Sequence, residues 1–220
     1  MLRFHSTRER LLGKQSWGWK MASSSFDFSD CDHGWVAGFA DYDVDEPAKF
    51  QLEHGFRARP VELGPGGSLF ISGMNRSDDL FMYYKKKLSG LPRSSPCSLS
   101  FSIELASKYI SEVGVGGNPG LGVTLKGCAS KTEPVLGADG RLDIDIGAQQ
   151  NPGSDSTVLG HIDKPVDGTD RYVLIQRGSE KRLKSETAAD GSLWVLIGSD
   201  SGYEGKTALY YTKFEIEIAA

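Results

Sequence analysis

Acidic and polar side chains gather in two segments that could bind a polar ligand. The first is Asn75-Arg76-Ser77-Asp78-Asp79 and the second is Asp200-Ser201-Gly202-Tyr203-Glu204. Both segments are expected to lie in loops that connect strands. Carboxylate, amide and guanidinium groups in such loops can orient a ligand by hydrogen bonds. The polar contacts are therefore predicted to come from Asn75, Arg76, Asp78, Asp79, Asp200 and Glu204.

Aromatic residues provide a second candidate feature. In residues 80–88 the even positions suit a core, which places Phe81 and Tyr83 on the opposite face of a strand, beside lysines. In residues 207–218 the same reasoning places Leu209 and Tyr211 opposite the core-facing phenylalanine and isoleucines. Aromatic rings on the solvent side of a sheet can stack against a sugar ring. The stacking candidates are Trp35, Tyr83, Tyr203 and Tyr211. The alternative is that long loops cover both faces of the sandwich.

No segment carries a complete catalytic signature. The serine in Gly198-Ser199-Asp200-Ser201-Gly202 would need a partnered histidine and an oxyanion hole, and no segment around a histidine supplies that partner. A glycosidase would need two carboxylates placed across a cleft, a geometry that a sequence does not show. No catalytic residue is therefore predicted. A hydrolase that uses Asp78, Asp79 or Glu204 is the lowest-ranked of three functional hypotheses.

Metal and cofactor motifs are incomplete as well. Asp41-Tyr42-Asp43-Val44-Asp45-Glu46 begins like a calcium loop, but Glu46 and Leu52 stand where an EF-hand requires glycine and a bidentate glutamate. A solvated acidic loop is expected there, with a calcium site of another type as the alternative. The glycine-rich residues 114–120 indicate a turn, because no helix follows to bind a dinucleotide. No metal site and no cofactor are predicted.

Charge separates the start of the chain from the rest. The net charge is −4, and residues 1–20 carry five basic residues and one acidic residue, which gives +4 there and leaves −8 for residues 21–220. An acidic body does not suit a nucleic-acid partner. No segment is apolar and long enough for an export signal or a membrane span, so a cytoplasmic location is the default expectation. Residues 1–21 are predicted to be a basic flexible extension and residues 22–220 a single domain.

The elements that position these residues are strands. Apolar and polar residues alternate with a period of two in residues 98–105, 141–146 and 213–218, a pattern typical of half-buried antiparallel strands. Less regular runs predict strands at 68–72, 80–88, 122–126, 171–176 and 193–197. Asp139-Gly140 and Asp190-Gly191 suggest hairpin turns. About ten short strands without helices predict an all-β sandwich of two antiparallel sheets.

Three stretches are similar to a jelly-roll β-sandwich of the carbohydrate-binding-module type. They are Phe26-Asp27-Phe28 leading to Gly34-Trp35, residues 80–105 with their Gly90-Leu91-Pro92 turn, and the closing run Ala208–Phe214. The resemblance spans residues 26–218 and implies the fold more than a ligand. Thr212 stands where many such modules carry an aspartate near a structural calcium, so calcium is not expected there. Residues 38–42, 77–82 and 200–205 also resemble uncharacterised bacterial proteins, some of them lipoprotein-like.

The leading functional hypothesis is a non-catalytic domain that binds carbohydrate. The second is a structural or protein-interaction domain, such as a homo-oligomer in which a partner subunit covers the aromatic face. The three cysteines, Cys31, Cys97 and Cys128, have no spacing typical of a disulfide framework or a metal site. They are expected to be reduced and mostly buried, and one disulfide with a free thiol is the alternative.

Overall fold

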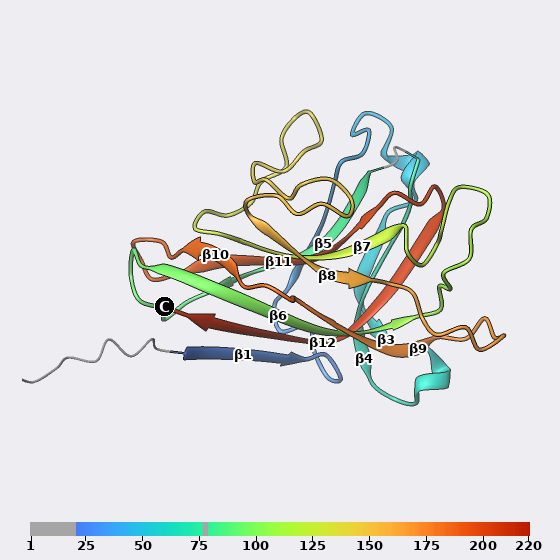
Figure 1. Ribbon diagram of the computed structural model, residues 1–220, viewed down its shortest axis with the longest axis horizontal. Coiled ribbons are helices and arrows are strands. Elements are labelled where there is room, and N and C mark those ends of the chain that lie inside the picture. Colours follow the sequence, from blue (N-terminus) through green and yellow to red (C-terminus); the bar gives the residue numbers. More distant parts are fainter. Residues whose placement is uncertain (1–20, 77–78) are drawn as a thin grey trace, which may run out of the picture.

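The chain folds into two packed antiparallel sheets (Figure 1). The computed structural model describes residues 21–76 and 79–220. Every strand pairing within these ranges is antiparallel, which confirms the predicted jelly-roll-like all-β sandwich. The helical segments of this part of the chain are two 3-10 turns, η1 (Pro47–Phe50) and η2 (Val61–Leu63). The strands are β1 (Met21–Asp27), β2 (Val36–Ala40), β3 (Glu53–Ala58), β4 (Gly67–Met74), β5 (Leu80–Leu88), β6 (Pro96–Ser107), β7 (Val123–Ser130), β8 (Ser156–His161), β9 (Val173–Gly178), β10 (Leu183–Glu186), β11 (Leu193–Ser201) and β12 (Lys206–Ala219).

The larger sheet has seven strands and is organised around β12. Its order is β10-β6-β12-β4-β3, with β1 paired to the second half of β12 and β9 paired to β6. Met21 belongs to β1 and pairs with Ala219, so the prediction that the extension includes residue 21 is wrong by one residue. The remainder of that predicted extension, residues 1–20, lies outside the described residues.

The smaller sheet has five strands in the order β2-β5-β11-β7-β8. The main core lies between the two sheets, and the alternation in β6 and in the second half of β12 supplies much of it, as predicted. Core side chains include Leu99, Phe101, Ile103, Phe214 and Ile216, each at most 3% exposed. Burial of such side chains stabilises the fold by roughly 1.5–3 kcal/mol each relative to exposure.

A loop covers the outer face of the five-stranded sheet. This covering loop, residues 131–155, joins β7 to β8 and forms much of the olive-yellow segment at the top of Figure 1. Leu142, Ile144 and Ile146 pack on a second apolar cluster that contains Phe81 and Tyr83. The predicted strand at 141–146 is therefore wrong. Its alternation arises because every second side chain faces the sheet below, while its backbone makes no extended ladder.

A β-bulge in β12 reverses the expected orientation of its first half. The register with β6 shifts between Tyr211 and Lys213. The extra residue, Thr212, restores the core orientation on both sides of the bulge. Leu209 and Tyr211 therefore face the same core as Phe214, and both are fully buried. The prediction that they face away from the core is wrong for this reason.

Two turns differ from their expected roles. Asp190-Gly191 joins β10 of one sheet to β11 of the other, so it is not a hairpin turn. Asp139-Gly140 turns within the covering loop, where a single bridge pairs Leu136 with Leu142.

Among the described residues, no helix is long and apolar enough to cross a membrane. Cys31, Cys97 and Cys128 are free thiols, as expected.

Candidate functional site

Asn75 joins the two predicted polar segments at one end of the sandwich. Its side chain is 2% exposed, and its Nδ2 donates to the carbonyl oxygens of Ser201 at 2.6 Å and Tyr203 at 3.1 Å. The backbone N–H of Asn75 donates to the carbonyl of Gly205. These bonds hold the segment after β4 against the turn between β11 and β12. The structure thus brings together two segments that are far apart in the sequence.

A buried ion pair lies beside this junction. Lys126 of β7 and Asp200 of β11 have side chains that are 0% and 2% exposed, and Nζ of Lys126 lies 2.7 Å from Oδ2 of Asp200. The same ammonium donates to the carbonyl oxygens of Ile146 and Asn151 in the covering loop. Asp200 Oδ2 also accepts the N–H of Gln149. The pair therefore fastens the covering loop to the sheet.

A side-chain hydrogen bond joins the carboxyl groups of Asp79 and Asp200. Oδ1 of Asp200 is buried and receives no hydrogen bond from any N–H or hydroxyl group of the described residues. The hydrogen bond between Asp79 and Asp200 is one of the interactions that favour the protonated form of Asp79. Burial first, and then the negative charges of Asp200 and Asp41, raise the pKa of Asp79 to about 7.

The Asp79 carboxyl borders a cavity of about 270 Å³. We call this cavity the acidic pocket. Burial and the charge of Asp200 also raise the pKa of Asp41 in its wall to about 6, and the nearby guanidinium of Arg141 opposes that shift. The lining residues are Asp41, Asp79, Arg141, Leu142, Ile144, Asp145, Ile146, Gly147 and Ala148. One wall is thus charged and the other is apolar.

Strand ends and the covering loop position the walls of the pocket. Asp41 directly follows β2 in a left-handed conformation with φ of 57°, and its N–H donates to the carbonyl of Gly140 at 2.7 Å. Asp79 directly precedes β5, the neighbour of β2. Asp145 accepts the N–H groups of Gly147 and Ser154, which lowers its pKa and keeps it ionised. Backbone N–H groups therefore hold the Asp145 carboxylate in place before any ligand arrives.

The predicted polar residues divide into two groups. Asp79 lines the pocket and is hydrogen-bonded to Asp200, and Asn75 binds the carbonyl oxygen of Ser201, the residue after Asp200. Arg76 and Glu204 are exposed near this end but do not line the pocket: Arg76 Nε donates to the carbonyl of Lys49, and the N–H of Glu204 donates to Gly116. Asp78 lies outside the described residues. The ligand contacts assigned to these residues stay predictions.

Three of the four predicted stacking residues do not face solvent. Trp35, Tyr83 and Tyr211 are 4%, 4% and 0% exposed. Trp35 packs edge-on against Phe214 in the main core, and Tyr83 stacks on Phe81 under the covering loop. Their exposure as stacking surfaces is contradicted, because Trp35 and Tyr211 lie in the main core. The alternative of loop coverage is correct for the sheet face that carries Tyr83. Tyr203, the fourth stacking candidate, is half-buried.

Sequence reasoning missed three residues with functional potential. Asp41 and Arg141 line the acidic pocket, but only the folded chain brings the loop after β2 to the covering loop. Trp194 is half-buried on the outward side of β11, with Lys85 Nζ 5.6 Å from its ring centre. The alternation of residues 193–197 places Trp194 opposite the core residues Leu193 and Val195 and could have identified it.

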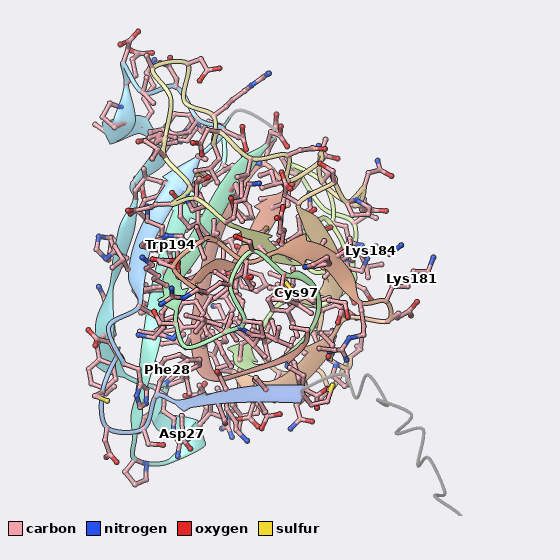
Figure 2. All side chains as sticks on the ribbon, turned by 90° about the vertical axis from the view of Figure 1, so that its left-hand side faces the viewer. Asp27, Phe28, Cys97, Lys181, Lys184 and Trp194 are labelled. Carbon is pink, nitrogen blue, oxygen red and sulfur yellow. The ribbon has the colours of Figure 1, made fainter. Side chains whose placement is uncertain are left out.

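A second cavity of about 460 Å³ lies along the edge strand β8 and includes His161, Glu180 and Lys181 in its lining. Figure 2 shows Lys181 on the side of the molecule opposite Trp194. None of the predicted site residues lines this cavity. Among residues 21–76 and 79–220, no group of three or more His, Cys, Asp or Glu side chains is arranged to hold a metal ion.

Comparison with known proteins gives structural matches only. No protein-family model and no curated protein matches the chain. A tailspike protein domain of bacteriophage CBA120 aligns at 11% identity and a TM-score of 0.34 over 82% of this chain, which spans about a fifth (19%) of that structure. A putative sugar-binding protein from Bacteroides thetaiotaomicron aligns at 12% identity and a TM-score of 0.43, over 82% of this chain and 86% of that one. The module CBM27-1 of Caldicellulosiruptor saccharolyticus, solved with mannohexaose, aligns at 13% identity and a TM-score of 0.41, over 88% and 96%.

Proposed function

We propose that this chain is a non-catalytic carbohydrate-binding domain that takes its ligand at the acidic pocket. The observation that carries the proposal is the mixed character of this cavity. Asp41, Asp79 and Arg141 offer acceptors and donors for hydroxyl groups, and Leu142 and Ile144 offer an apolar wall. A sugar ring presents hydroxyl groups at its rim and C–H groups on its faces, so it needs both kinds of surface.

The rigidity of the pocket supports this role. Asp79 and Asp41 flank paired strands, and the wall that carries Arg141 belongs to a loop held by the buried Lys126. Groups held in place before binding lose little conformational entropy when a ligand arrives. The covering loop therefore forms one side of a preorganised binding site.

Binding to a panel of soluble oligosaccharides, measured by isothermal titration calorimetry, tests the proposal. Arg141→Ala removes a charged donor from the wall and is expected to weaken binding about ten-fold to a hundred-fold, since a hydrogen bond to a charged group contributes roughly 1.5–3 kcal/mol. Arg171→Ala, an exposed residue outside the pocket, is the matched control and should leave affinity unchanged. If no carbohydrate binds, or Arg141→Ala binds as tightly as the parent, the proposal is wrong.

A hydrolase is the second candidate, favoured by one observation. Asp79 keeps a proton close to neutral pH in the same cavity as a second carboxyl group, Asp41. A carboxylic acid with a raised pKa near a second carboxylate is the pairing that glycosidases use. Release of reducing ends from the bound oligosaccharide would support this candidate if Asp79→Asn abolishes it. Intact ligand after prolonged incubation would exclude it for that ligand.

A further inference from the structure

Both partners of the Lys126–Asp200 ion pair are buried, unlike those of every other ion pair among the described residues. Nζ of Lys126 lies 2.7 Å from Oδ2 of Asp200, and the two side chains are 0% and 2% exposed. Lys164 is equally buried, but the side chain of its partner Asp167 is 42% exposed. An amine and a carboxyl group held together away from solvent are the reactants of an amide bond.

Burial favours the condensation of these two groups. In water, hydration stabilises the separate ammonium and carboxylate ions more than it stabilises an amide. A buried pair of ions loses this hydration, whereas a neutral amide has much less to lose. The paired strands β7 and β11 also hold the two groups in place. Well-oriented groups of one molecule react as if present at roughly 10⁵–10⁸ M.

Asp79 offers a path for the protons of this reaction. Its carboxyl group is hydrogen-bonded to Asp200 and borders the acidic pocket, through which a released water molecule can leave. The ammonium must lose a proton before its nitrogen can attack, and the departing oxygen must gain protons. Burial and the charges of Asp200 and Asp41 raise the pKa of Asp79 to about 7, so this group can both accept and donate a proton near neutral pH.

We propose that Lys126 and Asp200 condense to an intramolecular isopeptide bond, with Asp79 as the proton relay. The nitrogen of Lys126 attacks Cγ of Asp200, the C–N bond forms and one C–O bond breaks. Two of the three ammonium protons leave with that oxygen as water, and Asp79 returns to its starting state. The ion pair described above is the state before the reaction. Protein of full mass is in that state, and stability changes expected for the ion pair apply to it.

The bond would join β7 to β11 and close residues 126–200 into a covalent ring. This ring contains the covering loop, so the loop that completes the acidic pocket would stay tied to the sheet even in the unfolded chain. The remaining amide N–H can still donate to one of the loop carbonyl oxygens, Ile146 or Asn151, that now accept from the ammonium. A cross-link of this kind reduces the conformational freedom of the unfolded chain.

Intact-mass spectrometry of the full chain tests the proposal. During incubation of the folded protein at neutral pH, a species lighter than the sequence mass by one water molecule should accumulate. Tryptic mapping should find a peptide that joins Lys126 to Asp200 and is not cleaved after Lys126. The exposed Lys213–Glu215 pair, with Nζ 2.6 Å from Oε1, is the internal control and should stay unlinked. Full mass after prolonged incubation would overturn the proposal.

A second source of water loss is separated by the same mapping. Asp139-Gly140 and Asp190-Gly191 are sequences at which an aspartate can cyclise to a succinimide, which also releases water. A mass loss that maps to either of these turns, with Lys126 cleaved normally, would overturn the proposal. The measurement involves no ligand, so its outcome is independent of the proposed carbohydrate binding.

Two variants test the roles of the reacting groups. Lys126→Arg keeps the positive charge without a nucleophilic amine, so it should stay at full mass. Asp79→Asn should slow the loss of water about a hundred-fold or more, since general acid–base catalysis contributes roughly 10²–10⁴-fold. Asp45→Asn, a change at an exposed acid, is the matched control and should keep the parent rate.

Circular dichroism should show the same fold for all three variants. Loss of water from Lys126→Arg at the parent rate would overturn the assignment of the bond. An unchanged rate in Asp79→Asn would overturn the proposed proton relay.

Discussion

The Nζ atom of Lys126 lies 2.7 Å from Oδ2 of Asp200, and solvent reaches neither side chain to more than 2%. The ammonium has three acceptors, of which two belong to the covering loop. One buried cation therefore connects two neighbouring strands to the loop that completes the acidic pocket. Four predictions follow from this and other contacts.

Lys126→Met should be strongly destabilising. It leaves the carboxylate of Asp200 buried without its cation and frees two carbonyl oxygens, a loss of about 3–5 kcal/mol. Urea unfolding measures the change. Lys213→Met removes an exposed ion pair with Glu215 and should cost less than about 1 kcal/mol. Similar losses for the two variants would show that the Lys126 pair does not hold the loop.

Asp79→Asn should stabilise the protein at neutral and alkaline pH. The raised pKa means that the folded chain keeps a proton which the unfolded chain releases above about pH 4, so wild-type stability falls between pH 4 and about 7. Asparagine does not titrate and escapes this loss. Because Asp79 is only half-buried, we expect a gain of about 1 kcal/mol at pH 8 and almost none at pH 4. Urea unfolding at both pH values tests this, and a gain independent of pH would contradict it.

Gly38→Ala should disturb the packing under the covering loop. A Cβ atom at Gly38 would lie 2.3 Å from the ring of Tyr83, whose position is fixed by Phe81 and the loop. Such overpacking costs about 1–3 kcal/mol. Thermal unfolding should show the loss. Gly114→Ala adds the same atom in open space and should change stability by less than about 0.5 kcal/mol.

One thiol should react in the folded protein. Cys31 is exposed, whereas Cys97 and Cys128 are buried, and burial raises the pKa of Cys128 to about 12. The thiolate is the reactive form, so the buried pair should be inert. Titration with Ellman's reagent should detect one group in buffer and three in denaturant, and Cys31→Ser should remove the fast one. A second fast thiol in the native protein would contradict the burial of Cys97 or Cys128.

Local alternation was sufficient to predict β6 and the second half of β12, and a less regular run predicted β5. Alternation gave the wrong result where contacts between distant parts of the chain determine which side chains face the core. The bulge at Thr212 reverses which side chains face the core, and no local pattern reveals it. Residues 141–146 alternate like a strand because a sheet lies beneath them, although they form no ladder. A period of two therefore indicates that one side of a segment is buried, but it does not show that the segment is a strand of a sheet.

The candidate site was predictable only in part. Asp79, Asn75 and Asp200 could be selected because polar residues at strand ends gather at one end of a sandwich. Asp41 and Arg141 could not, since their meeting depends on how the covering loop crosses the sheet. The burial of Lys126 could not be predicted either. The alternation of its strand places Lys126 on the face that is expected to contact solvent.

The central position of β12 determines when the larger sheet can form. β12 pairs with β6 along one edge and with β4 and β1 along the other, and Met21 at the start of β1 meets Ala219. During synthesis, β1, β4 and β6 therefore emerge from the ribosome long before their common partner. Contacts between such distant positions give a high contact order, for which folding takes on the order of milliseconds to seconds. Until β12 arrives, these strands expose unpaired edges that chaperones would need to shield from aggregation.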